Sequence, residues 1–271
     1  MKCPNCQSTK LRKHGFYRGK QRYQCKDCAR QFVETHDPSL HQQTSTGVED
    51  RIDRYITSIS TPASDLLVNL QQATAQYPLA QMQPTLPQAQ LIALLIRSIR
   101  ASRVLELGIF NSYSTLAMAL ALPTSGKIIS CGVAGKHLDI ARAHWHQAGV
   151  EAKIDFQIGS GLELLETAKF ANKDRLLEHK PIEYFDLIVI SGLKHQYPRY
   201  YQHAIDLLRP NGLLITTDIL WQGKVLNPDT YNDDFTRGID VFNREIAADQ
   251  RVNVSVLPIG DGLSIATKIS G

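Results

Sequence analysis

Apolar residues recur at helical spacing soon after the N-terminal region. In residues 52–59 and again in 66–70 they stand three and four positions apart, which places them on one face of a helix. A stretch punctuated by three prolines then leads into an apolar segment over 91–99. The pattern therefore predicts three helices before residue 100.

Beyond residue 100, short β-rich runs alternate with helical patterns. The runs typical of strands are 104–107, 128–131, 154–158, 185–190 and 213–216. The helical patterns are 113–122, 137–148, 162–169, 199–208 and 236–248. This alternation predicts an α/β domain with a mostly parallel, doubly wound sheet covered on both faces. Two last strands, 252–257 and 263–268, should complete the sheet as an antiparallel edge.

At 271 residues and 43% hydrophobic content, the chain can form one large domain and a small one. It has no run of eighteen apolar residues, and its first residues do not resemble a secretion signal. We expect a cytoplasmic protein that does not interact with membranes.

Charge and cysteines mark residues 1–36 as a separate module. This segment carries nine Lys or Arg and two acids, whereas the remainder carries 21 and 24. Two Cys-x-x-Cys pairs, separated by eighteen residues, have the spacing of a closed structural zinc site. The predicted zinc ligands are Cys3, Cys6, Cys25 and Cys28. Two disulfides or four idle thiols are the alternatives.

Residues 14–24 alternate aromatic and basic side chains around glycines, which predicts a two-stranded ribbon. The module resembles the zinc ribbon of insertion-element transposases in its Cys-Pro-x-Cys, His14-Gly15, Arg22-Tyr23-x-Cys and Gln31-Phe32 segments. That resemblance implies contact with nucleic acid, although similar ribbons also dock proteins, and both partners stay open. Residues 37–47 are polar and aperiodic and read as a linker, which leaves 48–271 as the large domain.

Six segments of the large domain match one known family, namely 77–82, 104–108, 184–188, 207–213, 220–225 and 257–263. In these segments the domain resembles metal-dependent O-methyltransferases of the caffeoyl-CoA and catechol type. The resemblance implies a Rossmann-like fold that binds S-adenosylmethionine, and a homodimer. It also implies a cofactor site at Glu106, Gly108, Ser112, Ser114, Gly132, Ser160 and Gly161.

Several of those positions depart from the family pattern. The carboxylate that binds the cofactor ribose is replaced by Gly132, and the second glycine of the first motif is Ser112. We therefore expect S-adenosylmethionine to bind weakly or not at all.

In the family, the metal is bound by the motif Asp-Ala-Asp-Lys and by a later Asp-Asn pair. In this chain the first motif is replaced by Ser191-Gly192-Leu193-Lys194 and the pair by Thr217-Asp218. Asp218 would be the one remaining carboxylate, and magnesium needs several anionic oxygens, so we expect no magnesium site. Lys194 matches the general base of the family. Without a metal, the sequence favours a surface lysine.

Other polar clusters suggest no second site. Tyr197, Tyr200 and Tyr201 are predicted to pack within a helix, and Cys131 to be a small core residue. The histidines at 137, 144 and 146 do not share one helix face.

Three functions follow. The first is a methyltransferase-like protein with impaired catalysis that acts as a binding or assembly scaffold. The second is an active, metal-independent methyltransferase. The third is a nucleic-acid-associated regulator that works through its ribbon. The losses in the predicted cofactor and metal positions favour the first.

Overall fold

The structure is a computed structural model and describes residues 8–17, 20–28, 31–33, 49–77, 80, 83–109, 111–132, 135–166, 185–231 and 233–270. The chain divides into two compact units, Met1–Pro62 and Ala63–Gly271. Within the described ranges, no helix has the length and apolar character needed to cross a membrane. The predicted linker, 37–47, lies outside the described residues.

Within its described residues, the first unit contains a small antiparallel sheet and one helix. The sheet consists of β1 (Leu11–Tyr17), β2 (Lys20–Cys25) and β3 (Gln31–Val33), in that order, and the helix is α1 (Glu49–Ile59). The two antiparallel strands predicted for 14–24 are present as β1 and β2, and β3 is an additional strand outside that range. β3 pairs with the outer edge of β2, which satisfies backbone groups that a two-stranded ribbon would leave open.

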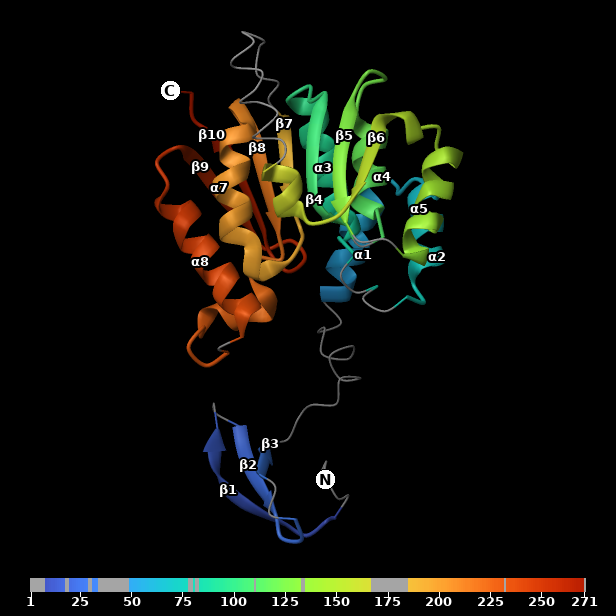
Figure 1. The fold of residues 1–271 in the computed structure, drawn as a ribbon. Helices are drawn as coiled ribbons and strands as arrows, with labels where there is room; N and C mark the ends of the chain where they lie inside the picture. Colours follow the sequence, from blue (N-terminus) through green and yellow to red (C-terminus); the bar gives the residue numbers. More distant parts are fainter. Residues whose placement is uncertain are drawn as a thin grey trace. The chain divides into compact units, whose positions relative to one another are not determined.

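The second unit, Ala63–Gly271, has the predicted α/β architecture (Figure 1), whereas the predicted domain, 48–271, also included α1, which falls in the first unit. Before the sheet come α2 (Asp65–Thr74) and α3 (Leu86–Ser98). The sheet region runs β4 (Arg103–Ile109), α4 (Tyr113–Ala121), β5 (Lys127–Gly132), α5 (Lys136–Gln147), β6 (Ile154–Ile158), β7 (Phe185–Ile190), α7 (Tyr197–Leu207), β8 (Leu208–Thr217), α8 (Asp234–Ala248), β9 (Val252–Leu257) and β10 (Leu263–Lys268). Residues 161–166 are also helical. Two short 3₁₀ helices, η4 (Lys194–Gln196) and η5 (Trp221–Leu226), follow β7 and β8.

The seven strands of this sheet lie in the order β6-β5-β4-β7-β8-β10-β9. The pairs β6-β5, β5-β4, β4-β7 and β7-β8 are parallel, and β10 is antiparallel to both β8 and β9. All seven predicted strands are present, and the predicted antiparallel edge is confirmed. The order reverses at β4, where the chain moves first to β5 and β6 and later to β7.

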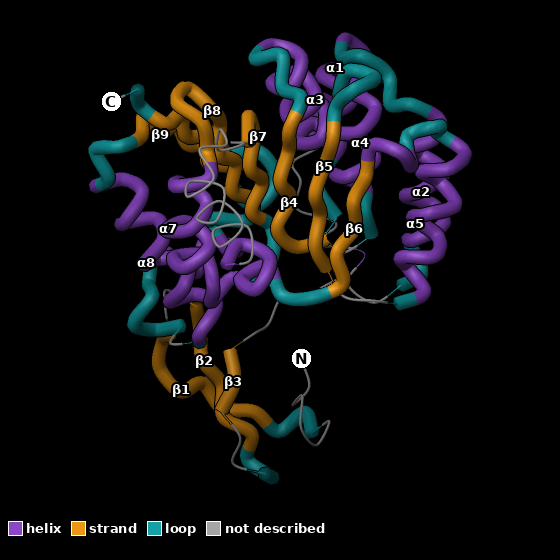
Figure 2. The backbone as a smooth tube through the Cα atoms, turned by 45° about the horizontal axis from the view of Figure 1, so that its top comes forward, coloured by secondary structure: helices purple, strands orange, loops and turns teal. Residues whose placement is uncertain are grey.

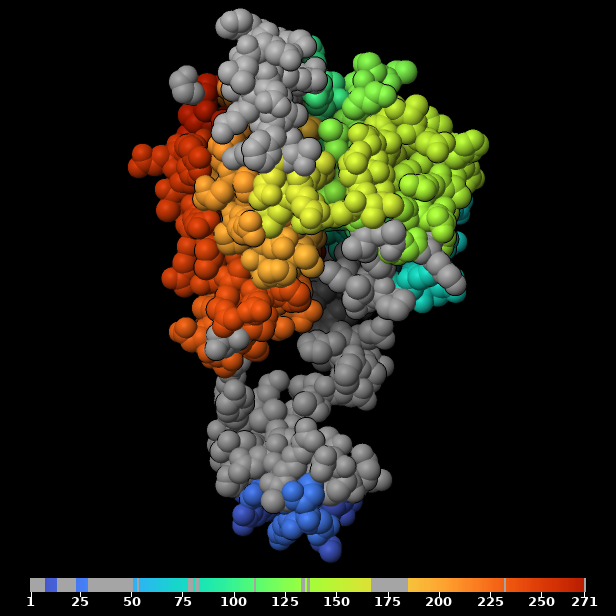
Figure 3. Space-filling view, viewed as in Figure 1, coloured from blue at the N-terminus to red at the C-terminus, as the bar shows by residue number. Residues whose placement is uncertain are grey.

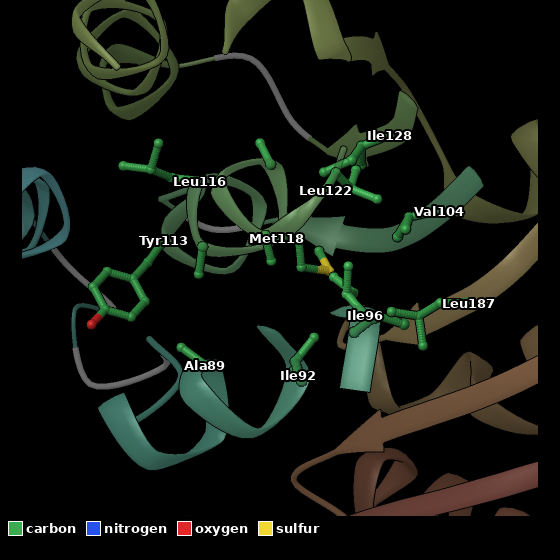
Figure 4. Packing of buried hydrophobic residues seen from close by; sticks show 14 of the residues in the cluster. Ala89, Ile92, Ile96, Val104, Tyr113, Leu116, Met118, Leu122, Ile128 and Leu187 are labelled. Carbon is green, nitrogen blue, oxygen red and sulfur yellow. The ribbon is translucent and has the colours of Figure 1, made fainter. Parts of the chain in front are cut away.

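Side chains alternate between the two faces of the sheet and form two cores. Val104 and Val189 point into the core under α2 to α5, whereas Leu105 and Ile188 point into the core under α7 and α8. Figure 2 shows the two helical layers on either side of the strands. Figure 4 shows the first core, where α3 and α4 pack over β4 and β5.

Helices of both layers reach the surface on the side seen in Figure 3. In Figure 3, α7 and α8 lie in orange to red beside the yellow-green segments that follow β5.

α7 begins at Tyr197, two residues earlier than predicted, because Pro198 in its first turn needs no hydrogen-bond acceptor.

Candidate functional site

A cavity of about 470 Å³ opens at the C-terminal ends of the central strands. Its lining comes from the ends of β4, β5 and β8 and from the turns after β6 and β7. In open α/β sheets, ligands bind at this edge where the strand order reverses. Five of the seven predicted cofactor residues line it, namely Gly108, Ser114, Gly132, Ser160 and Gly161.

Gly108 allows two turns to meet at the floor of the cavity. Its φ is +93°, and a Cβ built on it would lie 2.1 Å from the Cα of Gly192, so no larger residue fits. Ser191 holds the same turns together, because its N–H donates to the Leu107 carbonyl at 2.9 Å and its hydroxyl donates to the Gly108 carbonyl at 2.5 Å. The β4 and β7 turns are thus joined by backbone contact and two hydrogen bonds.

Glu106 is fully buried behind the cavity wall and does not line the cavity. Its carboxyl group accepts hydrogen bonds from the hydroxyls of Ser114, Thr115 (2.6 Å) and Ser130 (3.0 Å). Burial raises the pKa of Glu106, and the three hydroxyl donors oppose that rise. Glu106 therefore fixes the start of α4 to β4 and β5, and it orients Ser114, which does line the cavity.

Ser112 is likewise buried and off the cavity lining, at the N-terminus of α4. Its backbone is left-handed, with φ +61° and ψ +21°, a conformation that favours glycine. The neighbouring Asn111 was not among the predicted site residues, yet it lines the cavity. Its amide donates to Gln83 Oε1 at 2.6 Å and to Thr74 Oγ1 at 3.0 Å. The sequence could have indicated Asn111, because Asn is a preferred residue at the N-terminus of a helix.

Gly132 ends β5 at the cavity and brings no side chain to it. A Cβ at this position would lie 3.1 Å from the Ile109 carbonyl oxygen, closer than ordinary packing. Any side chain here would require β4 to move by a few tenths of an ångström. The end of β5 therefore offers backbone but no carboxylate.

Lys194 is buried, with 2% of the residue exposed, so the prediction of a surface lysine was wrong. Its ammonium group donates to Asp218 Oδ2 at 2.6 Å, to the Tyr197 hydroxyl at 2.6 Å and to the Ser191 carbonyl at 3.4 Å. The Tyr197 hydroxyl in turn donates to the Thr217 carbonyl at 3.1 Å. These partners come from the turns after β7 and β8 and from α7, and they take all three ammonium protons.

The ion pair keeps Lys194 charged. Burial alone would lower the pKa of Lys194, but the negative charge of Asp218 and the hydrogen bonds to Asp218 and Tyr197 outweigh it, and the net pKa is raised. Asp218 lines the cavity, while Lys194 lies behind it. One buried cation and one partly exposed carboxylate therefore neutralise each other at the cavity wall.

Comparisons with known proteins agree with this geometry. The O-methyltransferase family matches residues 57–269, most of the chain. The chain belongs to the O-methyltransferase family. A mouse relative, catechol O-methyltransferase domain-containing protein 1, is 38% identical over 216 residues, which cover 80% of this chain and 79% of the relative. Caffeoyl-CoA O-methyltransferase 1 of Eucalyptus globulus is 31% identical over 222 residues, covering 79% and 86%.

Solved O-methyltransferase structures match the fold as well. TomG of Streptomyces achromogenes, involved in tomaymycin synthesis and solved with S-adenosylmethionine, superposes with a TM-score of 0.71 at 25% identity, covering 81% of this chain and 96% of that one. A Bacillus cereus O-methyltransferase solved with S-adenosylhomocysteine gives 0.68 at 28% identity, covering 80% and 97%. The predicted Rossmann-like methyltransferase fold is confirmed.

In this chain, the positions that hold the metal in the resemblance to the family do not fit a divalent cation. Asp218 is the one carboxylate among the described residues that line the cavity, and one of its oxygens is held by Lys194. The Ser191 hydroxyl is engaged with the Gly108 carbonyl. Magnesium dehydrates reluctantly and is usually bound through one or two carboxylates. Here Asp218 is already paired with the Lys194 ammonium group. Across the described part of the chain, no three His, Cys, Asp or Glu side chains form a metal-binding group.

The tyrosines of α7 pack as predicted, with one addition. Tyr197 and Tyr201 contact the Phe242 ring edge-on, at centroid distances of 5.7 and 5.8 Å. Tyr200 also lines the cavity, and burial raises its pKa to about 12.

Cys131 is buried in the core and reaches the cavity as well. Burial raises the pKa of Cys131 to about 11, so it remains a thiol at neutral pH.

The predicted zinc ligands are only half described. Cys25 is buried at the end of β2, and Cys28 follows in the adjoining turn. The Lys26 N–H donates to the Lys10 carbonyl at 2.8 Å, which ties this turn to the segment before β1. Cys3 and Cys6 lie outside the described residues, so the four-cysteine zinc site remains a prediction.

Proposed function

We propose that the α/β domain is an O-methyltransferase-like binding scaffold that has lost metal-dependent methyl transfer. The observation that carries this proposal is the Lys194–Asp218 ion pair, 2.6 Å long, at the position where the family resemblance places the metal. The carboxylate that could attract a cation is already neutralised by an ammonium group of the chain. The cavity itself remains, which supports ligand binding without catalysis.

The same pair argues against Lys194 as a general base. A base must be deprotonated to accept a proton from the acceptor hydroxyl. The raised pKa of Lys194 keeps it protonated at neutral pH, and its three protons already have acceptors. Its role in this proposal is structural, joining the turn after β7 to the end of β8.

S-adenosyl compounds are the ligands we propose for the cavity. Its place at the strand ends and its size suit such a molecule, since small-molecule pockets hold roughly 300–1,000 Å³. Gly132 gives the ribose hydroxyls no carboxylate, which removes a contact of roughly 1.5–3 kcal/mol, or about one to two decades of affinity. We therefore expect binding weaker than micromolar.

Calorimetry with S-adenosylmethionine, with and without magnesium, tests the proposal together with a catechol methylation assay. We expect the same weak affinity in both buffers and no methyl transfer that depends on magnesium. Magnesium-dependent methylation of a catechol, or cofactor affinity that rises with magnesium, would contradict the proposal.

An active, metal-independent methyltransferase is the second candidate. It is favoured by the open cavity, in which the exposed part of Asp218 and the ring of Tyr200 stand beside the cofactor turn. A screen of hydroxylated acceptors in the presence of EDTA separates the two functions. Turnover that survives EDTA and fails in Asp218→Asn would support catalysis.

For the first unit, we propose a zinc ribbon that binds nucleic acid or a protein. The side chains of Lys10, Arg12, Lys13 and Lys26 are exposed, which supports a basic contact surface. Binding of nucleic acid through such residues weakens steeply with salt, whereas protein docking need not. We also propose that the chain forms a homodimer and is located in the cytoplasm.

A further inference from the structure

The strand β9 forms one edge of the seven-stranded sheet and lacks the residues that usually prevent further pairing. Among the described strands it neighbours β10 alone (Figure 1). Its sequence, Val-Asn-Val-Ser-Val-Leu, contains no charged residue and no proline, whereas the opposite edge strand, β6, contains Asp155. Edge strands usually carry charges or prolines, because their open row of N–H and C=O groups can otherwise pair with another chain. β9 therefore offers a place for a further strand.

The register of β9 shows which of its backbone groups point away from the sheet. One position beyond the pair Lys268–Val252, the Ile269 N–H donates to the Arg251 carbonyl at 2.8 Å. In an antiparallel ladder, hydrogen-bonded and non-hydrogen-bonded pairs alternate along the strands. The residues of β9 that bond to β10 are therefore 253, 255 and 257. Those whose N–H and C=O groups face outward are Val252, Val254 and Val256.

The side chains of β9 leave apolar surface open on the same edge. Val252 is buried in the core under α7 and α8, and Val254 packs partly against that core. Val256 is 54% exposed, and its backbone groups also face outward. A second strand laid over this position would remove apolar surface from water and give the open backbone groups partners.

We propose that β9 pairs with β9 of a second copy of this chain, antiparallel and centred on Val254, so that the two sheets join edge to edge. This inference rests on the homodimer of the proposed function and adds the surface through which it forms. A two-fold axis perpendicular to the sheet keeps each face of one sheet continuous with the same face of the other. Val254 then lies opposite Val254 of the partner subunit, and Val252 lies opposite Val256 of the partner subunit.

This register is self-complementary in hydrogen bonding and in charge. Each of these valine pairs joins two outward-facing residues, which exchange two backbone hydrogen bonds. On the other face of the ladder, the exposed Asn253 lies opposite Ser255 of the partner subunit, and both side chains are uncharged. Arg251, which precedes the strand, is already paired with Asp249 at 2.6 Å. The pairing therefore places no like charges opposite each other.

The size of the contact sets the expected strength. Two paired six-residue strands bury less surface than the roughly 1,200–2,000 Å² of a standard stable interface. We therefore expect a reversible dimer with a dissociation constant on the order of 10 µM.

Analytical ultracentrifugation of the full chain between about 1 and 100 µM tests the pairing. Val254→Pro removes an outward-facing N–H and leaves the ladder with β10 in place, since proline is tolerated on an edge strand where its nitrogen faces solvent. Val254→Thr keeps both this N–H and the β-branched shape, and it is the matched control. We expect Val254→Pro to stay monomeric over the whole range and Val254→Thr to dimerise like the wild type.

Val256→Lys provides a second variant that does not depend on the backbone of β9 accepting a proline. It adds one charge to the paired edge of each copy, so the dimer should weaken by at least about tenfold. Leu94→Lys is its control, because Leu94 is 59% exposed on α3, in the other helical layer. This control should leave the dissociation constant unchanged.

Amide hydrogen exchange locates the contact directly. We expect the amides of Val254 and Val256 to be protected where the dimer forms and to lose this protection on dilution. A dimer whose Val254 and Val256 amides exchange equally fast at both concentrations, or one that persists unchanged in Val256→Lys, would overturn this inference and leave the proposed homodimer standing. A chain that remains monomeric at about 100 µM would overturn both.

Discussion

At the scale of single residues, the site depends on backbone conformations that side chains cannot easily share. Gly108 and Ser112 both have positive φ, at the two ends of the turn between β4 and α4. Gly108 suits this conformation, whereas Ser112 is strained in it. A left-handed conformation costs a residue with a Cβ roughly 1–2 kcal/mol.

Ser112→Gly should therefore stabilise the domain. Part of the relief is offset by the greater freedom of glycine in the unfolded chain, so we expect a gain of about 0.5–1 kcal/mol in the free energy of unfolding. Denaturant unfolding measures it. Ser112→Ala keeps the strained Cβ and is the control; an equal gain in that variant would show that strain is not the cause.

Gly132→Asp should restore part of the affinity for S-adenosylmethionine, by about tenfold, because a carboxylate can accept both ribose hydroxyls. The gain stays partial, since the new Cβ would lie 3.1 Å from the Ile109 carbonyl and β4 must shift. Gly132→Ala makes the same shift without the carboxylate, so calorimetry should detect no gain in that variant. Equal affinities for the two variants would disprove the ribose argument.

Residue types alone could not place Lys194 correctly. Its local sequence, Ser191-Gly192-Leu193-Lys194, resembles an exposed turn. The partner that buries it, Asp218, is 24 positions away, and the two meet only because β7 and β8 are neighbours in the sheet. Gly108, Ser114, Ser160 and Gly161 could be predicted to line the cavity, because the family resemblance carries local motifs at these positions.

At the scale of elements, the periodicity of apolar residues predicted the strands and helices. The wrong boundary lies where pairing between strands, and not periodicity, determines where a strand begins. β8 begins at Leu208, five residues before the predicted strand, and includes Pro210. Proline has no backbone N–H to donate to a neighbouring strand, so the sequence around Pro210 indicates a loop. A register shift between Phe185 and Leu187 accommodates this segment beside β7.

Asp186 connects these elements at the opposite end of the sheet. Its carboxylate accepts from the Ser102 N–H at 2.7 Å, the Arg103 N–H at 2.9 Å and Arg209 Nε at 2.6 Å. Burial would raise the pKa of Asp186, but these donors outweigh it and the pKa is lowered. The folded state therefore favours the ionised form.

Asp186→Asn should lower the free energy of unfolding at neutral pH by about 2 kcal/mol, since the charged hydrogen bonds are weakened. A lowered folded pKa gives stability that is present above the unfolded pKa of about 3.9 and is lost as the pH falls through the folded value. The difference between wild type and variant should thus shrink below about pH 4. Unfolding curves across pH measure it; a difference that does not change with pH would contradict the account.

At the scale of the whole molecule, the chain forms two compact units, and each should fold separately. We expect one zinc ion per chain, measured by elemental analysis after purification under reducing conditions. Cys25→Ser should unfold the first unit, because four thiolates close the predicted site. The melting of the α/β domain should hardly change. Protein without zinc, or loss of both units together, would refute this view.

We propose that Lys194 has replaced the metal in this member of the O-methyltransferase family. Titration of the full chain with Mn²⁺, followed by electron paramagnetic resonance in the presence of S-adenosylmethionine, tests this replacement. We expect the spectrum of hydrated Mn²⁺ throughout, identical in wild type and Asp218→Asn. One bound Mn²⁺ per chain that disappears in Asp218→Asn would contradict it.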